Sequence, residues 1–456
     1  MVRHLWANAA GYLAAQRIKV KWKSYMGSKE KTKRKSSFIS VFEKEGAAFI
    51  WSFFYFFSLL TAYFILRPIR DAMGIASGIG FLPDLFTYTF LVMLAVMPIY
   101  GALVSRFPRR KLIPYIYLFF IGNLILFWYF FANNLYMDVV AQVFFVWLSV
   151  FNVFVVSIFW SFMVDIFKSG DSKRLFGLIA SGGTIGSIAG PLVVTFLIDR
   201  IGTGSLLLIS AGILVFSIVC VLKLVGLRKD QRIDVVAQND GDEKAIGGGV
   251  LAGVTEILKS RYLIGVSGLV FLLSLTATFA YFQQGALIYD GYPDTEERVK
   301  IFALIERYVS ITALIFQVFI SGPLLSRYGI KVSIIILPIL TVVGFALLSI
   351  SPTIGVFIVF QTVRRATEYG LFVPSRENLF SVVSREQKYK AKNFIDTAVF
   401  RGGDVVNGWI YNGLNSIMGL SIAAIAMIGV PIAALWGVLA WRLGRVHEKN
   451  DVKGEK

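Results

Sequence analysis

Charged residues inside apolar segments are the part of this sequence that can do chemistry. Arg364, Arg365 and Glu368 follow one another in one apolar stretch, and Arg401 and Asp404 lie in the next. An ionisable side chain at membrane depth is costly, and it is kept mainly where it is paired or faces a wet cavity. These residues are therefore the first candidates for binding an ion or a charged substrate.

Helical spacing predicts which of these charges pair. Arg364 and Glu368 are four residues apart and can form an ion pair, which leaves Arg365 freer to face a cavity. Over all the apolar segments seven arginines oppose five carboxylates, so we expect a net positive cavity. The arginines are Arg67, Arg70, Arg307, Arg364, Arg365, Arg376 and Arg401, and the carboxylates are Asp71, Glu306, Glu368, Glu377 and Asp404.

We expect substrate contact from Arg70, Arg365 and Arg376. Ion pairing is the expected role of the other arginines, foremost Arg67, Arg307 and Arg401. Three neutral polar residues in apolar runs can hydrogen-bond a base or sugar or else fill gaps in the packing, namely Asn152, Gln283 and Gln284. The carboxylates are candidates for a proton site or for cavity charge pairs.

The segments that carry these residues must be membrane helices. The 456-residue chain is 56% hydrophobic and 16% charged, which does not fit an ordinary soluble surface. Runs of about 20 apolar residues are long enough to cross a bilayer. We predict an all-α membrane protein with twelve transmembrane helices in two six-helix bundles. The runs are 47–66, 85–104, 112–131, 139–159, 178–198, 205–225, 263–282, 301–325, 332–350, 354–373, 394–417 and 422–443.

The net charge of +18 indicates topology, because Lys and Arg cluster in every second connection between these runs. We predict a basic cytoplasmic tail at 1–46 without a cleavable signal, bundles at 47–225 and 262–443, a cytoplasmic linker at 226–261 and a cytoplasmic tail at 444–456. The predicted location is the bacterial inner membrane, with both termini cytoplasmic and the chain a monomer in the lipid bilayer.

A ten-residue motif occurs once in each half. Residues 101–110 read Gly-Ala-Leu-Val-Ser-Arg-Phe-Pro-Arg-Arg, and residues 322–331 read Gly-Pro-Leu-Leu-Ser-Arg-Tyr-Gly-Ile-Lys. Both resemble the signature between helices 2 and 3 of the major facilitator superfamily, although Ser105 replaces its aspartate. The resemblance implies a two-bundle carrier with a central site. It also implies gating roles for Gly101, Arg106, Arg110, Gly322, Arg327 and Lys331.

Glycines in the fifth run allow two interpretations. Gly177, Gly186, Gly190 and Pro191 keep the spacing of the superfamily's antiporter signature, without its terminal Gly-Gly. Gly182, Gly186 and Gly190 also make a small-residue stripe of the kind that lets two membrane helices pack closely. The sequence leaves exchange and helix packing as equal alternatives.

Three further segments resemble the ATP/ADP translocase family and its shorter proteobacterial relatives. These are Leu-Arg-Pro-Ile-Arg-Asp at 66–71, Pro-Ser-Arg-Glu-Asn-Leu-Phe at 374–380 and Lys-Ala-Lys-Asn-Phe-Ile-Asp at 390–396. The family's two substrate-linked lysines would correspond to Arg70 and Arg376. The resemblance implies secondary transport of an anionic, phosphorylated small molecule, with exchange of ATP and ADP as one form of it.

Other classes of function fit less well. No Gly-x4-Gly-Lys-Ser/Thr loop is present for ATP hydrolysis, and neither a histidine-based dyad nor a metal-ligand cluster is found, so we expect no enzyme, no cofactor and no metal. The basic charge lies between apolar runs, so we expect no nucleic acid partner. A proton-coupled carrier or an exporter of another organic anion or drug remains open. A non-transporting receptor or scaffold is the remote alternative.

Overall fold

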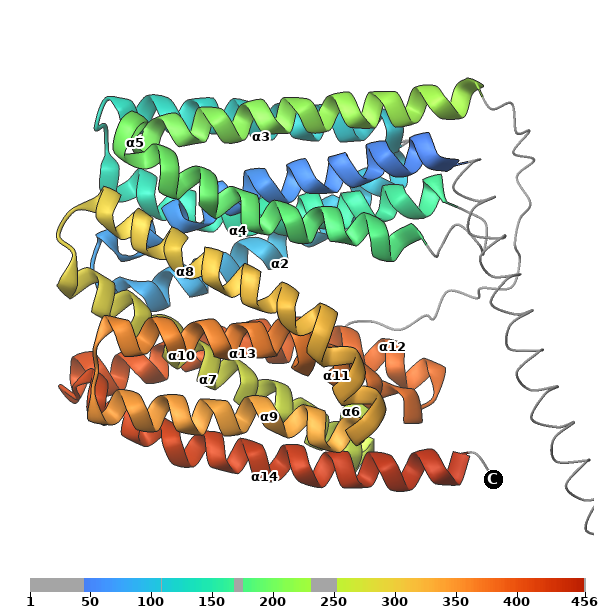
Figure 1. The fold of residues 1–456 in the computed structure, drawn as a ribbon, viewed down its shortest axis with the longest axis vertical. Helices are drawn as coiled ribbons and strands as arrows, with labels where there is room; N and C mark the ends of the chain where they lie inside the picture. The colour runs from blue at the N-terminus through green and yellow to red at the C-terminus, as the bar shows by residue number, and fades with distance from the viewer. Residues whose placement is uncertain (1–44, 108, 168–174, 231–251, 455–456) are drawn as a thin grey trace, which may run out of the picture.

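The computed structural model describes residues 45–107, 109–167, 175–230 and 252–454, and the regular elements in these ranges are all helical (Figure 1). Eight helices among the described residues are long and apolar enough to cross a membrane. Each of the twelve predicted runs lies within helical residues. The elements are a first helix Glu45–Ala76, η1 Ile79–Phe81, α2 Leu82–Arg106, α3 Arg109–Ala132, α4 Met137–Ile166, α5 Leu175–Asp230, α6 Ala252–Lys259, α7 Arg261–Gly291, α8 Thr295–Ile315, η3 Phe316–Ser321, α9 Gly322–Ile350, α10 Ile354–Thr367, η4 Glu368–Phe372, α11 Val373–Asn378, η5 Leu379–Val382, α12 Arg385–Phe394, η6 Ile395–Val399, α13 Phe400–Asn412, η7 Gly413–Ile417 and α14 Ile422–Gly454.

Two continuous helical stretches reverse direction at a glycine. α5 has 56 residues, and a straight helix of that length would be about 84 Å long. Gly202 breaks α5 with φ 72°, and Gly329 breaks α9 in the same way with φ 72°. A positive φ favours glycine because a Cβ would clash with the backbone. Figure 1 accordingly shows α5 as two antiparallel arms.

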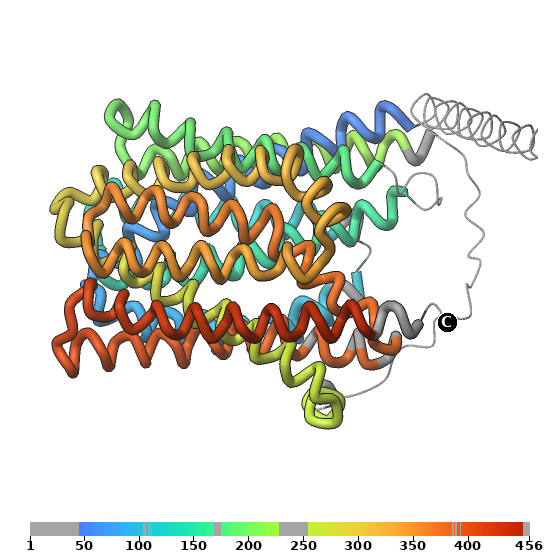
Figure 2. The backbone as a smooth tube through the Cα atoms, turned by 60° about the horizontal axis from the view of Figure 1, so that its bottom comes forward, coloured from blue at the N-terminus to red at the C-terminus, as the bar shows by residue number. Residues whose placement is uncertain are grey.

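The two halves of the chain lie side by side. In Figure 1 the helices up to residue 230, in blue to green, occupy the upper side, and those from residue 252, in yellow to red, occupy the lower side. α8 packs along α5, and the turned view in Figure 2 keeps these two helices together. Another contact between the halves joins α2 and α13. The cavity described below lies between the two halves.

The glycine stripe of α5 packs against the first helix. A Cβ at Gly186 would lie 2.5 Å from the carbonyl oxygen of Phe57, and one at Gly190 would lie 2.8 Å from the carbonyl carbon of Phe64. Backbone atoms cannot move aside as a flexible side chain can. The packing interpretation of these glycines is therefore confirmed, whereas an exchange function is not tested by this contact.

Four π-helical segments, η3, η4, η6 and η7, interrupt the described helices after residue 315. η4 directly follows the arginine pair of α10, and its Gly370 lies where a Cβ would be 2.7 Å from Phe316 of η3. The Ser321 hydroxyl, at the end of η3, donates a hydrogen bond to the Gly370 carbonyl. Such segments are frequent at functional sites, and here they join α8 and α9 to the end of α10.

Parts of the predicted linker and of the predicted C-terminal tail are helical. The predicted linker at 226–261 contains helix α6, and the predicted tail at 444–456 is a continuation of α14 to Gly454. His447 in that continuation is buried and contacts the carbonyl oxygen of Asn378. Residues 1–44 and 231–251 lie outside the described ranges, and so do Lys168, Lys173 and Arg174 of the predicted basic loops.

The residues with implied gating roles lie on helices rather than in loops. Gly101 and Arg106 belong to α2, and Arg110 lies in the first turn of α3. The second copy of the motif lies wholly in α9, across the break at Gly329. Gly322 and Arg327 are exposed, and Lys331 is half-buried. The gating role of these residues stays a prediction.

The close contact at Gly186 predicts a selective loss of stability. Gly186→Ala should lower the free energy of unfolding by about 1–3 kcal/mol, because the added methyl group overpacks against the Phe57 carbonyl. Gly177→Ala on the same helix is the matched control, since a Cβ there meets nothing within 4 Å. Melting temperatures in detergent measure both variants. Equal stability of the two would show that the helices can separate without cost.

Candidate substrate site

A cavity of about 390 Å³ lies between the two halves. Both halves line it: the first helix, α2 and α4 from one side, and α7, α10, η4 and α13 from the other. Pockets of several hundred Å³ are typical of small-molecule sites. The lining residues are Tyr63, Arg67, Arg70, Asp71, Phe86, Thr89, Phe90, Met93, Phe145, Ser149, Asn152, Ala277, Thr278, Tyr281, Gln284, Gln361, Arg364, Arg365, Glu368, Tyr369, Phe400, Arg401 and Asp404.

The cavity carries a surplus of positive charge. Its lining includes five arginines, Arg67, Arg70, Arg364, Arg365 and Arg401, and three carboxylates, Asp71, Glu368 and Asp404. Glu306 lies directly behind the wall and pairs with two of these arginines, which makes four carboxylates. Five arginines thus share four carboxylates, and this net charge of +1 suits an anion.

Glu306 of α8 joins the two halves through a buried ion pair. Its Oε1 accepts a hydrogen bond from Arg365 Nη1 at 2.5 Å, and its Oε2 accepts one from Arg365 Nη2 at 3.0 Å. Oε2 also lies 3.4 Å from Nη1 of Arg67 on the first helix. The Glu306 side chain is only 2% exposed. The expectation that Arg365 is freer than its neighbour is therefore wrong, because a residue of another helix holds it bidentately.

Arg67 is held more loosely than Arg365. Its Nε is buried and has no hydrogen-bond partner among the described residues, and its contact with Glu306 lacks hydrogen-bond geometry. The side chain is 18% exposed, compared with 7% for Arg365. Arg67 was expected to be a paired residue, and it is one. It nevertheless retains donor capacity towards the cavity.

Arg70 and Asp71 form the next charge pair. Arg70 Nη2 lies 2.6 Å from Asp71 Oδ1, and the guanidinium lies 4.9 Å from the ring centroid of Phe145. Tyr281 of α7 donates a hydrogen bond to the same Asp71 oxygen at 3.0 Å, which links the halves a second time. Arg70 is therefore on the cavity wall, as expected, with a carboxylate on one side and an aromatic face on the other.

The ion pair predicted on α10 is confirmed. Arg364 Nη1 lies 3.3 Å from Glu368 Oε2, and Arg364 Nε donates to Gln361 Oε1 at 3.1 Å. Gln361 in turn donates to Gln284 Oε1 at 3.1 Å. Gln284 and Asn152 line the cavity as predicted, whereas Gln283 does not, because its amide points to the Ile422 carbonyl at 3.4 Å.

Arg401 and Asp404 of α13 also form the predicted pair. Their closest atoms, Nη1 and Oδ2, are 3.6 Å apart, and Asp404 Oδ1 accepts a hydrogen bond from Ser274 at 2.7 Å. The Arg401 side chain is 48% exposed, the most of the cavity arginines. It is the arginine of the second half that is best placed to meet a substrate.

Three further predicted site residues lie outside the cavity lining, namely Arg376, Glu377 and Arg307. Arg376 Nη2 is 3.4 Å from Glu377 and 3.2 Å from Asp396, and Lys392 is 2.5 Å from Glu377, so these residues form a separate charge cluster. The substrate contact expected of Arg376 has no support in this cavity. Arg307 has no carboxylate within 4.0 Å among the described residues, and its guanidinium lies 5.3 Å from the ring centroid of Tyr308.

Several lining residues were not predicted. Gln361 has a weak signal, since it is a polar residue one helical turn before Arg364 in an apolar run. No sequence signal identifies the aromatic lining residues Tyr281, Tyr369 and Phe145. Aromatic residues are frequent along the whole chain, and their spacing does not show which of them face the cavity.

Comparison with known proteins agrees with this geometry. A family model described as Major Facilitator Superfamily matches residues 49–372. A curated relative, ADP,ATP carrier protein 1 of Chlamydia pneumoniae, is 21% identical over 328 residues, which are 63% of this chain and 63% of that protein. The chain thus spans less than two thirds of that relative's length.

Solved structures show the same fold. A point mutant of the nucleoside transporter NupG is 15% identical with a TM-score of 0.57, covering 88% of this chain and 98% of that one. A bacterial homologue of the iron transporter ferroportin in an inward-facing state is 10% identical with a TM-score of 0.62, covering 88% and 98%. A D-xylose–proton symporter is 12% identical with a TM-score of 0.59, covering 87% and 97%. At these identities the likeness concerns the fold alone.

The burial of Glu306 predicts a large stability effect. Glu306→Gln leaves Arg67 and Arg365 without their counter-charge, so the free energy of unfolding should fall by about 3–5 kcal/mol. Glu256→Gln is the control, because its partner Lys259 is 64% exposed and such a surface pair is worth about 0–1 kcal/mol. Thermal unfolding in detergent compares the two. A Glu306→Gln protein as stable as the control would remove Glu306 from the account as a structural counter-ion.

Proposed function

The chain belongs to the major facilitator superfamily, and we propose that it is a secondary transporter that moves an organic anion through the arginine-lined cavity by alternating access. The main observation that supports this proposal is the net charge of +1 in a cavity lined by both halves. An excess of buried positive charge is unfavourable at membrane depth, and a visiting anion reduces that cost.

The proposed architecture is twelve membrane-spanning segments in two six-helix bundles, 47–225 and 262–443. The chain reversals at Gly202 and Gly329 support it, because each divides one long stretch into two segments. We place the protein in a bacterial inner membrane as a monomer, with both termini and the connection at 226–261 on the cytoplasmic side. The alternation of basic connections along the sequence supports this orientation.

The exposed fractions of the cavity arginines indicate which of them can contact a substrate. Arg67 at 18%, Arg70 at 14% and Arg401 at 48% are more exposed than Arg364 at 3% and Arg365 at 7%. The proposed contacts are therefore Arg67 and Arg70 from the first half and Arg401 from the second. An anion held by both halves favours their approach, which is the differential contact that a conformational change requires.

The proposed substrate is a phosphorylated compound with an aromatic or sugar portion, and adenine nucleotide exchange is its most specific form. Guanidinium groups bind phosphate oxygens by paired hydrogen bonds. The cavity lining also includes the rings of Phe86, Phe145 and Tyr281, and the amides of Asn152 and Gln284. The name of the chlamydial relative, an ADP,ATP carrier protein, supports the same direction.

The structure supports one state of the transport cycle. The halves contact each other near residues 199–203 and 295–300, which we call the closed end. There Lys300 Nζ lies 2.5 Å from Asp199 Oδ2, and Glu296 accepts a hydrogen bond from the Thr203 backbone amide at 3.3 Å. The C-terminal end of α14 lies at the opposite end (Figure 1). We infer that the cavity exchanges substrate with the side on which α14 ends.

Proton coupling is the second candidate mechanism, and Asp404 is the observation that favours it. Its side chain is 13% exposed, lines the cavity and is 3.6 Å from its arginine partner. A carboxylate so placed can take up a proton when the pair opens. In that case flux would depend on a pH gradient and would not need a counter-substrate.

Alternating access predicts that joining the closed end stops transport. Asp199→Cys with Lys300→Cys, linked by a thiol-cleavable crosslinker, should abolish flux in proteoliposomes, and reduction should restore it. The native Cys220 is buried, so it adds little background. Glu256→Cys with Lys259→Cys, within one helix, is the control pair and should keep its flux when linked. Undiminished flux in the linked 199/300 protein would contradict alternating access at this end.

The proposed ligands predict which arginines control affinity. In proteoliposomes loaded with ADP, Arg67→Gln and Arg70→Gln should each weaken ATP uptake affinity about ten- to a hundredfold, the value of one charge-assisted hydrogen bond. Arg442→Gln is the control, because Arg442 is exposed on α14 outside the cavity.

The same uptake assay distinguishes the candidate substrates. It also distinguishes the two candidate driving forces, a counter-substrate and a pH gradient. Phosphorylated sugars and dicarboxylates are offered in place of ATP, with and without internal counter-substrate and a pH gradient. Uptake of nucleotide only against internal nucleotide supports exchange, and uptake that collapses with the pH gradient supports proton coupling. Binding without flux for every compound would contradict the transporter proposal.

A further inference from the structure

A cluster of side-chain oxygen atoms lies where α7 packs against α13, at the wall of the central cavity. The Ser274 hydroxyl donates a hydrogen bond to Asp404 Oδ1 at 2.7 Å, and Asn407 Nδ2 donates one to the Ser274 hydroxyl at 3.1 Å. Thr278 lines the cavity with Asp404 and hydrogen-bonds its carboxylate. We call Ser274, Thr278, Asp404 and Asn407 the α7–α13 oxygen cluster.

Helical spacing brings these four side chains together. Ser274 and Thr278 are four residues apart on α7, and each of the two shares one face of that helix with the other. Asp404 and Asn407 are three residues apart on α13 and share a face in the same way. Gly403 allows the two faces to meet closely, because a Cβ there would lie 3.0 Å from Ser274 Oγ. The cluster is therefore held by two packed helices and not by a loop.

One oxygen of the cluster has no hydrogen-bond partner. Asn407 is 0% exposed, and its Oδ1 accepts no hydrogen bond from the described residues. A buried polar atom without a partner is unfavourable, and such an exception in a folded protein indicates an ion or another functional role. Because Nδ2 of this amide contacts Ser274, a half-turn of the amide presents Oδ1 to Ser274 and Asp404 instead. The facing atoms are then all oxygens, which a cation would satisfy.

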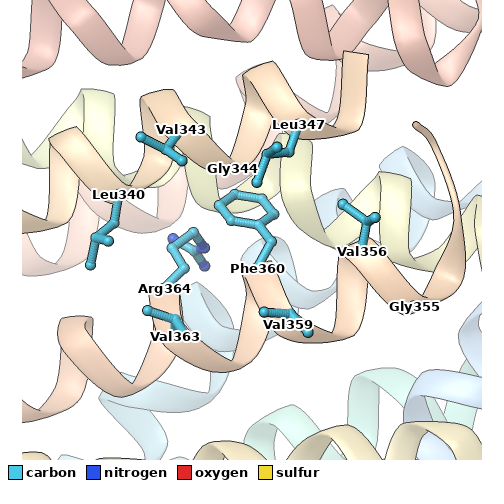
Figure 3. Close-up of a pocket in the computed structure, with 10 residues that line it drawn as sticks. All are labelled: Leu340, Val343, Gly344, Leu347, Gly355, Val356, Val359, Phe360, Val363 and Arg364. Carbon is cyan, nitrogen blue, oxygen red and sulfur yellow. The ribbon is translucent and has the colours of Figure 1, made fainter. Parts of the chain in front are cut away.

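Two neighbouring arginines leave this cluster open. Arg401 approaches the other carboxylate oxygen of Asp404, Oδ2, at 3.6 Å, which is too long for a hydrogen bond, and its side chain is 48% exposed. Arg364 also lines the cavity, but Figure 3 shows its guanidinium between Leu340 of α9 and Phe360 of α10. Among the described residues no other arginine or lysine forms an ion pair with Asp404.

We propose that the α7–α13 oxygen cluster binds a sodium ion, with the Asp404 carboxylate, the two hydroxyls and the Asn407 amide oxygen as ligands. Hard cations prefer oxygen ligands, and water from the cavity can fill the remaining positions. A single carboxylate among neutral oxygens balances the charge of a monovalent ion. The short side chains and the close approach at Gly403 favour sodium over the larger potassium ion. The set contains no histidine or cysteine, so no metal-ligand spacing marks it in the sequence.

Sodium at this site would act on Arg401. The ion would neutralise Asp404, the carboxylate partner of Arg401, and would repel the guanidinium. Arg401 would then be free to meet an anion in the cavity. This consequence rests on the proposed function and deepens it, because sodium takes the role of coupling ion that a proton has in the second candidate mechanism.

Equilibrium binding tests the proposal without any transport assay. Radiolabelled sodium is titrated onto the purified full-length protein in detergent, in choline chloride at constant ionic strength and pH. Wild type should bind the label saturably, with one ion per chain. Unlabelled NaCl should displace it, and KCl at the same concentration should not.

Two serines of α7 give a matched pair of variants. Ser274→Ala removes a proposed ligand and should weaken sodium binding about tenfold, the value of one neutral hydrogen-bonding group. Ser267→Ala is the control, because the Ser267 hydroxyl donates to the Leu263 carbonyl of its own helix. It should bind sodium as wild type does.

Substitutions of Asn407 distinguish a lost ligand from a lost fold. Asn407→Leu has a similar size without the oxygen and should abolish saturable binding. Asn407→Asp places a charged oxygen in the cluster and should bind sodium more tightly than wild type does. A folding defect cannot produce that gain in affinity.

Four results would each overturn the proposal. They are no saturable binding by wild type, displacement by KCl as effective as by NaCl, equal binding by the two serine variants, and binding by Asn407→Asp no tighter than by Asn407→Leu. The binding assay contains no organic anion, so its failure would leave the proposed anion transport standing. A failure of ATP uptake would likewise leave sodium binding standing.

Discussion

An arginine buried at membrane depth requires a counter-charge, and the arrangement of this cavity follows from how that requirement is met. Glu306 supplies a carboxylate to Arg67 and Arg365, Asp71 to Arg70, Glu368 to Arg364 and Asp404 to Arg401. Because Glu306 serves two arginines at once, one positive charge is left over. Burying an ion pair costs desolvation energy that its attraction hardly repays. A set of such pairs around a cavity between the two halves is more readily explained by function than by stability.

The position of each pair relates charge to conformational change. Arg67 belongs to the first half and Glu306 to the second, so this contact must change when the halves move apart. Tyr281 and Asp71 make a second such contact. An anion bound between Arg67, Arg70 and Arg401 would replace part of what Glu306 provides. Substrate and protein carboxylate would then compete for the same cations, which gives a physical reason for coupling binding to movement.

Ion pairs between residues close together on one helix could be predicted from the sequence. Ion pairs between residues on different helices could not. The Arg364–Glu368 pair is four residues apart on one helix, and the helical period reveals it. The Arg365–Glu306 pair joins residues 59 apart in the chain, so only the tertiary packing of α8 against α10 defines it. The helical segments followed from apolar length. The π-helical segments and the position of Arg376 outside the cavity depend on packing that no single-sequence pattern encodes.

The central claim is that Glu306 occupies a charge position which a substrate anion can also occupy. The most direct measurement is the rise in melting temperature that ATP produces in Glu306→Gln compared with wild type. A ligand stabilises the folded state according to its affinity and concentration. The account predicts a larger rise in the variant, because an anion then neutralises two uncompensated arginines. An equal or smaller rise at every ATP concentration, with phosphorylated sugars and dicarboxylates behaving in the same way, would contradict it.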